Sequence, residues 1–389
     1  MIFLDHNATT PLDPAVLDAM LPFLREHHAN PSSPYTAARK AAAAIETARQ
    51  QVAGLIGAAS DEIIFTAGGT ESNNTALHSA VANAGAPSRL LVSAVEHASV
   101  MEAAQAQTRW GHTVGVVAVR GDGRLDEASL EAALENHVTV IAVMMANNES
   151  GVLFDVAAVA AKARARGALV HTDAVQAAGK IPVRVRDLGV DTLSLCAHKM
   201  HGPKGVGALF IREGLDFVPL VHGGGQEQAR RAGTENVAGI VGFGKAAELA
   251  AGRIEFMQGR IASLRDAMEH SILSAVPRIE IAGARGPRLP NTSLLLIEGV
   301  DAEALIARLD MEGLCVSSGS ACASGANEPS HVLSAMGISG QLLRSAVRIS
   351  LGWNSTSTDT DCLVRRLCVG VQELREVGAR TGSARGGGA

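Results

Sequence analysis

The sequence is poor in aromatic residues and has no long apolar run. Phe, Trp and Tyr make up 3% of its 389 residues, although 47% are hydrophobic. No apolar stretch approaches the roughly 20 residues that a membrane-spanning helix requires. Residues 1–5 show neither the basic start nor the small-residue cleavage site of a signal peptide. We therefore expect a globular, cytoplasmic chain with no membrane partner.

Cysteines are few, and no charge of one sign dominates. The five cysteines form an odd set without a Cys-x-x-Cys pair, which fits neither a disulfide framework nor a zinc site. The net charge is −5, and acidic and basic residues are interspersed without a basic stripe. Because affinity for nucleic acids comes largely from basic residues that neutralise phosphates, the sequence predicts no nucleic-acid partner.

What the sequence does contain is an alternation of short apolar runs with helical patterns. Asp13-Pro14 and Ser33-Pro34 each combine an N-capping residue with proline, and predict helices that end near residues 26 and 54. A long helical pattern covers residues 236–275. The predicted strands are residues 62–65, 90–93, 114–119, 138–144, 168–171, 192–195 and 206–211. This alternation predicts an α/β fold with a doubly wound, mainly parallel sheet, whose ligands gather at the carboxyl ends of the strands.

The length of the chain favours two domains, because 389 residues exceed one ordinary hydrophobic core. We expect a large domain of residues 16–254. Residues 1–15 and 255–377 would form a smaller α+β domain, with strands at 292–297 and 347–351. The Gly-rich residues 378–389 cannot bury a core and are predicted to be a flexible tail.

Two charged side chains that follow predicted strands suit pyridoxal phosphate. Lys199 enters a turn rich in Gly and Pro, where a desolvated amine could form a Schiff base with the cofactor. Asp173 closes another apolar run and could pair with the ring nitrogen. Alternatives remain open at this point. Lys199 could be a surface lysine, in which case Lys204 would be the candidate for the cofactor lysine. Asp173 could instead cap the following helix.

A Gly-rich turn between a predicted strand and a helix is a candidate phosphate site. Residues 65–74 read FTAGGTESNN. Backbone amides in such a turn can approach an anion, and the dipole of the following helix favours negative charge. The same pattern is equally typical of an ordinary helix start, so its interpretation depends on Lys199 and Asp173.

Further candidates are a cysteine, an arginine and three histidines. Cys322 lies among small residues, where exposure favours a reactive thiolate. Arg348, on a predicted strand, could clamp a substrate carboxylate or form a structural ion pair. His97 could stack on a cofactor ring and transfer protons, or be structural. The spacing of His198 and His201 resembles that of metal ligands, but no cysteine or carboxylate completes a set.

Together these features make the chain resemble the cysteine desulfurases of the NifS/IscS type, in the class V aminotransferase family of fold-type I pyridoxal-phosphate enzymes. The resemblance runs nearly end to end. It rests on LDHNATT (4–10), NPSS (30–33), GTESN (69–73), EH (96–97), NNE (147–149), HTDAVQ (171–176), HK (198–199), GT (233–234) and the loop of Cys322.

The resemblance implies a catalytic cycle. Lys199 would hold the cofactor and then transfer protons, while Asp173 keeps the ring nitrogen protonated. His97 would stack on the ring and act in acid–base steps. Cys322, on a long mobile loop, would attack the sulfur of L-cysteine, leaving a persulfide and alanine. Further implied cofactor contacts are Gly69, Thr70, Asn148, Gln176, Cys196, Ala197, His198 and, from the partner subunit of a homodimer, Thr234. Asn148 and Arg348 would bind the substrate.

The resemblance also implies a sulfur acceptor, a scaffold protein for iron–sulfur clusters. The nitrogen-fixation NifS branch, which supplies nitrogenase metalloclusters, is favoured over a housekeeping donor for general cluster assembly and tRNA thiolation. Cys322 could itself bind iron through its persulfide. The alternatives are a selenocysteine lyase, which would tolerate loss of Cys322, and a non-enzymatic sulfur carrier in which Lys199 is structural.

The chain departs from the family pattern at several positions. Cys196 stands where a serine usually donates to the cofactor phosphate, and because a thiol is a poorer donor we expect weaker cofactor retention. His6 replaces an asparagine, Tyr35 a histidine, and Gln228-Ala229 an Arg-Gly pair. These changes concern subunit contact and site entry rather than the reaction.

Overall fold

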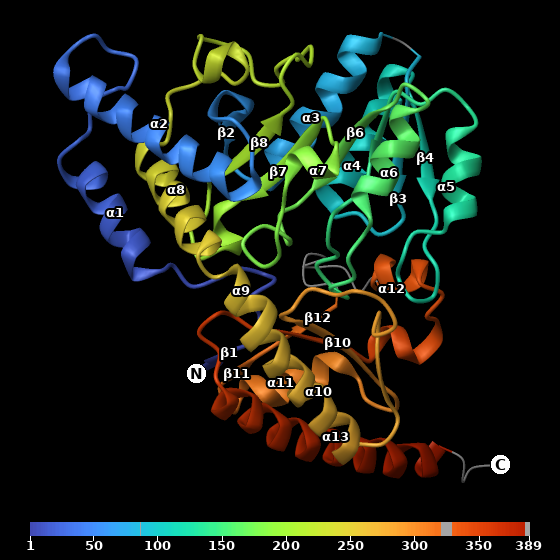
Figure 1. Cartoon of the computed structure of the whole chain (residues 1–389). Coiled ribbons are helices and arrows are strands. Elements are labelled where there is room, and N and C mark those ends of the chain that lie inside the picture. Colours follow the sequence, from blue (N-terminus) through green and yellow to red (C-terminus); the bar gives the residue numbers. More distant parts are fainter. Residues whose placement is uncertain (86, 320–328, 386–389) are drawn as a thin grey trace.

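The computed structural model describes residues 1–85, 87–319 and 329–385, which form a large α/β unit and a smaller α+β unit (Figure 1). The large unit contains a seven-stranded sheet of order β2-β8-β7-β6-β5-β3-β4. Only β8 runs antiparallel to its neighbours in this sheet, and the other pairs are parallel. The strands are β2 (Ile63–Thr66), β3 (Arg89–Ser93), β4 (Thr113–Val117), β5 (Val140–Ala142), β6 (Leu169–Asp173), β7 (Thr192–Cys196) and β8 (Gly207–Ile211).

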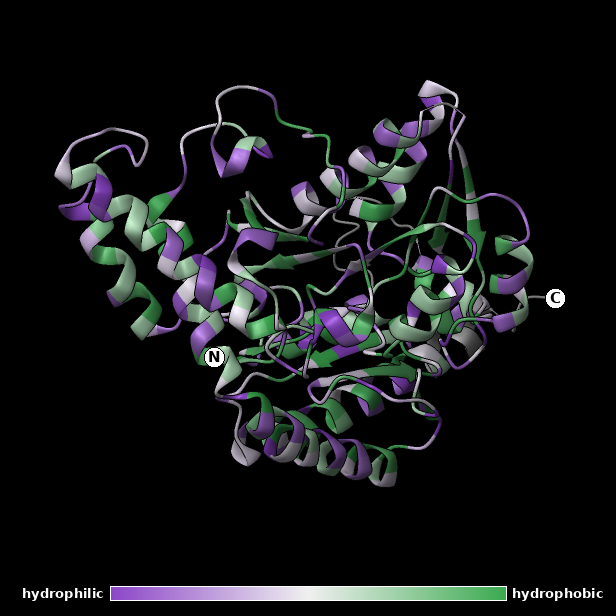
Figure 2. Cartoon of the chain, turned by 45° about the horizontal axis from the view of Figure 1, so that its top comes forward, coloured by the Kyte–Doolittle hydropathy of each residue, from purple (hydrophilic) through white to green (hydrophobic). Residues whose placement is uncertain are grey.

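Helices cover both faces of this sheet, which confirms the predicted doubly wound α/β fold. Leu90 and Val92 of β3 belong to one apolar cluster with α3 (Gly69–Ala84) and α4 (Ala98–Gln107). Leu91, which points to the other face, packs in a second cluster with α2 (Thr36–Ile56), α6 (Val156–Arg164) and α8 (Val237–Ala251). Figure 2 accordingly shows largely green central strands and helices that change between green and purple. Burial on both faces explains why these strands read as continuous apolar runs.

The remaining helices surround this sheet or belong to the small unit. They are α1 (Pro14–Arg25), α2 (Thr36–Ile56), α5 (Glu127–Leu134), α6 (Val156–Arg164), α7 (Val185–Leu188), α8 (Val237–Ala251), α9 (Ile254–Phe256), α10 (Ala262–Ala275), α11 (Ala302–Asp310), α12 (His331–Ala335) and α13 (Ser357–Arg385). Among the described residues, none of the helices is both long and apolar enough to cross a membrane.

The start of α1 is confirmed, whereas the predicted start of α2 is wrong. The carboxylate of Asp13 accepts a hydrogen bond from the Ala15 nitrogen at 2.9 Å, with proline in the first helical turn. Helix α2 begins only at Thr36, without a side-chain cap. Asn30 explains the delay: its side chain accepts from the Ser32 nitrogen and its carbonyl from the Ser33 nitrogen, so these residues form a turn.

The long helical pattern over residues 236–275 does not form one continuous helix. It divides into α8, α9, a π-helical stretch (Met257–Ile261) and α10. At the break, Arg253 donates to the Asp13 carboxylate at 2.9 Å and lies 3.9 Å from the centre of the Trp353 ring. These tertiary contacts fix the chain where it leaves the large unit. The neighbouring residue is Gly252, and glycine has a low helix propensity.

The small unit is built on an antiparallel sheet of order β12-β13-β10-β9. Its strands are β9 (Ile279–Ile281), β10 (Thr292–Ile297), β12 (Ser317–Ser318) and β13 (Ala346–Ser350), while β1 (Ile2–Phe3) pairs in parallel with β11 (Leu314–Cys315). The first residues of the chain therefore lie with this unit. Helix α13 lies across the bottom of Figure 1 and includes residues 378–385, which the sequence predicts as flexible tail.

Candidate active site

The predicted lysine and aspartate meet at the carboxyl ends of adjacent strands. Asp173 is the last residue of β6, and Lys199 follows β7 after a single 3₁₀ turn (Ala197–Lys199). The two strands pair in parallel, with Asp173 opposite Ser194. Because the carboxyl ends of parallel strands share one edge of the sheet, side chains far apart in the sequence converge here.

The amine of Lys199 is held inside the protein. Its Nζ donates to the carbonyl oxygens of Asn7 and Ala8, at 2.5 and 2.6 Å. Lys204, the rival candidate, is exposed. The structure therefore favours Lys199 as the lysine that could react with a cofactor aldehyde.

Asp173 is buried in a network organised by Asn73. The Asn73 Nδ2 donates to the Asp173 Oδ2 at 2.8 Å, and the Val175 nitrogen donates to Oδ1 at 2.9 Å. Asp173 thus caps the turn that follows, as one of the two interpretations of the sequence predicts. A buried carboxylate held by such donors can face a protonated ring nitrogen.

Asn73 also joins this network to two histidines. Its Nδ2 donates to the Ser99 Oγ at 2.8 Å, and the Ser99 Oγ lies 2.8 Å from the Nδ1 of His97. Since Nδ2 is used for donation, the Oδ1 of Asn73 accepts from the Nε2 of His171 at 2.9 Å. Burial lowers the pKa of His171 to about 4, so its ring is neutral. The sequence placed Asn73 in a motif but did not reveal this role, which depends on contacts between distant segments.

The Gly-rich turn and the residues after β7 enclose an open cavity of about 750 Å³, lined by Ala8, Thr9, Gly69, Thr70, His198 and Lys204 among others. Gly69 and Gly207 permit its tight backbone. A Cβ on Gly207 would lie 2.7 Å from the Gly68 backbone, and one on Gly69 would lie 2.9 Å from a Val175 methyl group. The cavity lies at the N-terminus of α3, as expected for a phosphate site.

Two side chains near this cavity are neutral. Burial, followed by the charge of Lys199, lowers the pKa of His198 to about 4. Burial raises the pKa of the Cys196 thiol to about 12. Cys196 is fully buried, and its Cβ lies 4.0 Å from where a Cβ on Gly69 would be. The thiol therefore lies close to the turn, where it can offer only a weak donor. Ala197 contributes backbone to the same buried turn.

Arg348 is buried at the junction of the two units and has an ion-pair partner. Its Nη2 lies 2.7 Å from the Asp5 Oδ1, and its Nη1 donates to the Asn148 carbonyl at 3.1 Å. Its buried Nε has no hydrogen-bond partner among the residues that the structure describes. The structural ion pair is thus present. Gln176, also buried, donates from Nε2 to the Asn7 carbonyl at 2.9 Å.

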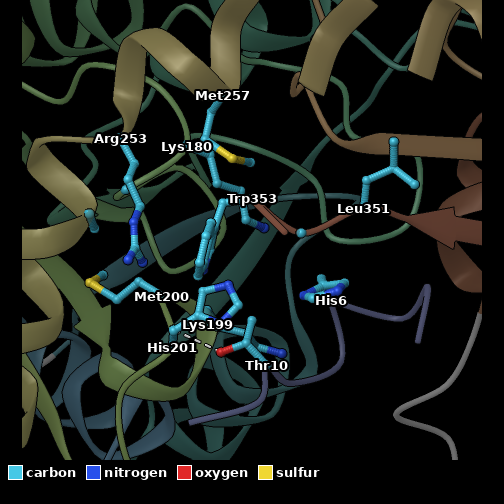
Figure 3. Close-up of a pocket in the computed structure, with 13 residues that line it drawn as sticks. His6, Thr10, Lys180, Lys199, Met200, His201, Arg253, Met257, Leu351 and Trp353 are labelled. Carbon is cyan, nitrogen blue, oxygen red and sulfur yellow. Dashed lines mark hydrogen bonds between the residues drawn. The ribbon is translucent and has the colours of Figure 1, made fainter. Parts of the chain in front are cut away.

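A small second cavity lies beside Lys199 (Figure 3). His6, His201, Arg253 and Trp353 line it together with Lys199. Burial lowers the pKa of His6 to about 3 and that of His201 to about 4, so both rings are neutral.

Cys322, the predicted nucleophile and possible iron ligand, lies outside the described residues. On either side of the segment that contains it, the chain contacts Glu149, which the sequence did not single out as a separate site. The Ser330 hydroxyl donates to the Glu149 Oε2 at 2.6 Å, and a Cβ on Gly319 would lie 3.0 Å from the same oxygen. Burial raises the pKa of Glu149 to about 7.

Thr234 is exposed. A few residues before it, Glu227, Gln228 and Ala229 have φ of 47°, 59° and 62°, and the last two are positions where the chain departs from the family pattern. As for metals, the part of the chain that the structure describes contains no group of three His, Cys, Asp or Glu arranged to hold an ion.

The donor set fits pyridoxal phosphate. It combines an amine for the aldehyde, a buried carboxylate for the ring nitrogen and a helix N-terminus for the phosphate. The chain can therefore hold this cofactor with Lys199, Asp173 and the Gly69-Thr70 turn.

Comparisons with known proteins agree with this site. The model of the aminotransferase class-V family matches residues 2–363. A cysteine desulfurase of Cereibacter sphaeroides is 48% identical over 376 residues, covering 96% of this chain and 96% of its own length. A cysteine desulfurase of Bradyrhizobium diazoefficiens is 45% identical over 361 residues, 92% of each chain. The crystal structure of a NifS-like protein from Rickettsia africae aligns with a TM-score of 0.86 at 34% identity, over 97% of this chain and 99% of that one.

Proposed function

This chain belongs to the aminotransferase class-V family and is a pyridoxal-phosphate-dependent cysteine desulfurase, and we propose that Lys199 carries its cofactor and Cys322 receives the sulfur. The observation that carries the proposal is the convergence of Lys199, Asp173 and the N-terminus of α3 at one edge of the sheet. When bound, pyridoxal phosphate supplies an electron sink for bond breaking at the substrate carbons. The protein supplies position, charge and protons.

Three groups of the chain would orient the reactants. The Asp173 carboxylate, fixed by Asn73 and the Val175 nitrogen, holds a proton on the ring nitrogen. The backbone of the Gly69-Thr70 turn binds the phosphate together with neutral His198. The Arg348 guanidinium, which lies beside the Asn148 backbone, would bind the substrate carboxylate.

Lys199 and His97 would move protons, and Cys322 would take the sulfur. The Lys199 amine, held by the Asn7 and Ala8 carbonyls, would transfer protons at its Nζ. His97 receives its orientation from Ser99. The Cys322 thiolate attacks the sulfur of L-cysteine, so that an S–S bond forms and the C–S bond breaks. The carbon keeps that electron pair and takes up a proton, giving alanine and a persulfide on Cys322.

The destination of the sulfur and the assembly of the enzyme are part of the same proposal. We assign the sulfur to a scaffold protein for iron–sulfur clusters, and to nitrogenase metalloclusters in particular, on the resemblance to the nitrogen-fixation branch. Measured rates of ³⁵S transfer to nitrogen-fixation and to general cluster scaffolds would decide between these acceptors. The exposure of Thr234 supports a homodimer in which this residue reaches the partner's phosphate site. The odd, unpaired cysteine set supports a cytoplasmic enzyme.

The test is release of sulfide and alanine from L-cysteine with a reductant, for the parent, Lys199→Ala and Cys322→Ala. We expect both variants to lose activity by at least about a thousandfold, because each removes a group that reacts covalently. Cys322→Ala should retain the yellow cofactor. If Cys322→Ala releases sulfide at the parent rate, Cys322 is not the acceptor. Activity of that variant on selenocysteine alone would instead indicate a selenocysteine lyase.

A further inference from the structure

A second lysine, Lys180, is buried close to Lys199 and has no part in the mechanism above. Its side chain is 4% exposed. Figure 3 shows Lys180 and Lys199 on the wall of the same small cavity. Burial, and next the charge of Lys199, lower the pKa of Lys180 well below its ordinary value. A lysine in this position costs stability unless its hydrogen bonds compensate, so its partners indicate why it is there.

The Lys180 amine donates to two amide oxygens. Its Nζ lies 2.7 Å from the Gln176 Oε1 and 2.9 Å from the Asn7 Oδ1. A lysine side chain is only a hydrogen-bond donor, which matches these two acceptors. Lys180 therefore gives each of the two buried amide oxygens a donor.

The orientation of both amides follows from their other partners. The Gln176 Nε2 donates to the Asn7 carbonyl at 2.9 Å, so its Oε1 faces Lys180. The Asn7 Nδ2 donates to the Asn148 carbonyl at 3.1 Å, so its Oδ1 faces Lys180 as well. Because a carbonyl only accepts, neither amide can be turned over without losing a hydrogen bond.

These contacts lead directly to Lys199. The Asn7 carbonyl that accepts from Gln176 also accepts from the Lys199 Nζ, at 2.5 Å. Asn7 further donates to the Thr292 hydroxyl of β10 at 2.9 Å, which connects the cluster to the small unit. Lys180 thus binds the side chain of Asn7, whose carbonyl accepts from the Lys199 amine. It also binds the side chain of Gln176, which donates to the same carbonyl.

We propose that Lys180 is a positioning residue of the cofactor site: its amine fixes the side chains of Gln176 and Asn7, and thereby holds the Gln176 nitrogen on the Asn7 carbonyl that accepts from Lys199. The inference deepens the proposed function and rests on Lys199 as the cofactor lysine. It assigns to Lys180 an effect on the bound cofactor that passes through Gln176.

The experiment compares Lys180→Met with Lys245→Met, which removes a partly exposed lysine of α8 whose partner is Glu248. Apoproteins are titrated with pyridoxal phosphate, and the dissociation constant and the absorption maximum of the bound cofactor are measured. We expect Lys180→Met to raise the dissociation constant by on the order of tenfold, because the Gln176 Oε1 loses the Lys180 donor and the Asn7 Oδ1 keeps only the Asn291 Nδ2, at 3.2 Å. Its absorption maximum should shift, whereas Lys245→Met should match the parent. Parent values in Lys180→Met would overturn the proposal.

A double-mutant cycle separates positioning from general destabilisation. If Lys180 acts through Gln176, Lys180→Met should change the dissociation constant much less in a Gln176→Met background than alone. Equal changes in both backgrounds would show that Lys180 acts independently and contradict the proposal. Should Lys180→Met fail to fold, Lys180→Gln replaces it, since its shorter side chain cannot span both oxygens. Parent-like binding and absorption in that variant would equally contradict the proposal.

Borohydride reduction of the loaded parent, followed by peptide mass spectrometry, tests the premise separately. Label on Lys199 supports it. Label on Lys180 overturns the inference, because Lys180 would then be the cofactor lysine itself. Label on any other lysine overturns the proposed role of Lys199, while the cycle still reports whether Lys180 and Gln176 are coupled.

Discussion

At the scale of single residues, the departures from the family pattern have local physical consequences. Ala229 occupies a position where the family commonly has glycine, and its φ of 62° lies in the left-handed region. The strain persists because Glu227 is anchored on both sides. Its carboxylate accepts from Arg49 at 2.6 and 2.9 Å and from the Phe65 nitrogen at 2.8 Å. Strong anchoring is what allows an unfavourable backbone conformation to remain in a folded protein.

We therefore expect Ala229→Gly to increase the free energy of unfolding by about 1 kcal/mol, since glycine adopts this conformation without a Cβ clash. The matched control is Ala267→Gly in the regular helix α10, which should lose about 1 kcal/mol through helix propensity. Urea denaturation of both variants and the parent measures the effect. Destabilisation by both substitutions would contradict the assignment of strain to Ala229.

At the scale of secondary-structure elements, the connection from β3 to α4 places a carboxyl group inside the protein. Glu96 is fully buried, and its Oε1 accepts from the Ser93 hydroxyl at 2.6 Å and the Met144 nitrogen at 2.7 Å. Within residues 1–85, 87–319 and 329–385, its Oε2 has no hydrogen-bond partner. Burial raises the pKa of Glu96 from 4.5 to about 8. The Glu96 carboxyl, which is protonated at neutral pH, thus connects the turn before His97 to the residues that follow β5.

This shift makes stability depend on pH with a definite sign. Between pH 4.5 and 8 the folded state keeps a proton that the unfolded state releases, so the free energy of unfolding falls as the pH rises. We expect the parent to lose on the order of 4 kcal/mol from this group between pH 5 and 8, whereas Glu96→Gln has no such loss. Denaturation of both proteins at the two pH values gives the comparison. A difference between them that does not change with pH would disprove the raised pKa.

At the scale of the whole molecule, the site lies where the two units meet. Asn7, from the first segment of the chain, contacts Lys199 and Gln176 of the large unit and Thr292 of the small one. Arg348 of β13 connects to Asn148 of the large unit in the same region. Thr234 is exposed in the single chain, and the proposed homodimer would give it a place at the partner's phosphate site.

A mixed dimer tests that arrangement. We expect weak activity at limiting pyridoxal phosphate from the Lys199→Ala homodimer and also from the Thr234→Val homodimer. In a mixed dimer one site would combine an intact Lys199 with an intact Thr234 from the partner. Activity after co-refolding should therefore exceed the sum of the separate variants. Activity equal to that sum would place Thr234 outside the partner's site.

The sequence alone determined the parts of this protein that local patterns encode. The seven strands of the large sheet lie within a few residues of the predicted ranges, because strands buried on both faces need continuous apolar runs. Asp173 and Lys199 could be recognised because each directly follows such a run. The start of α1 was equally visible, since its cap lies next to the helix in the chain.

Only the tertiary structure decided what depends on residues far apart in the chain. The turn before α2 and the break after α8 follow from specific contacts that override helical patterns. The hydrogen bond between Asn73 and Asp173 joins residues 100 positions apart in the sequence. The one between Lys180 and Asn7 joins residues 173 positions apart. Such partners leave no local periodicity, because a buried polar group is satisfied by whichever segment the fold brings to it.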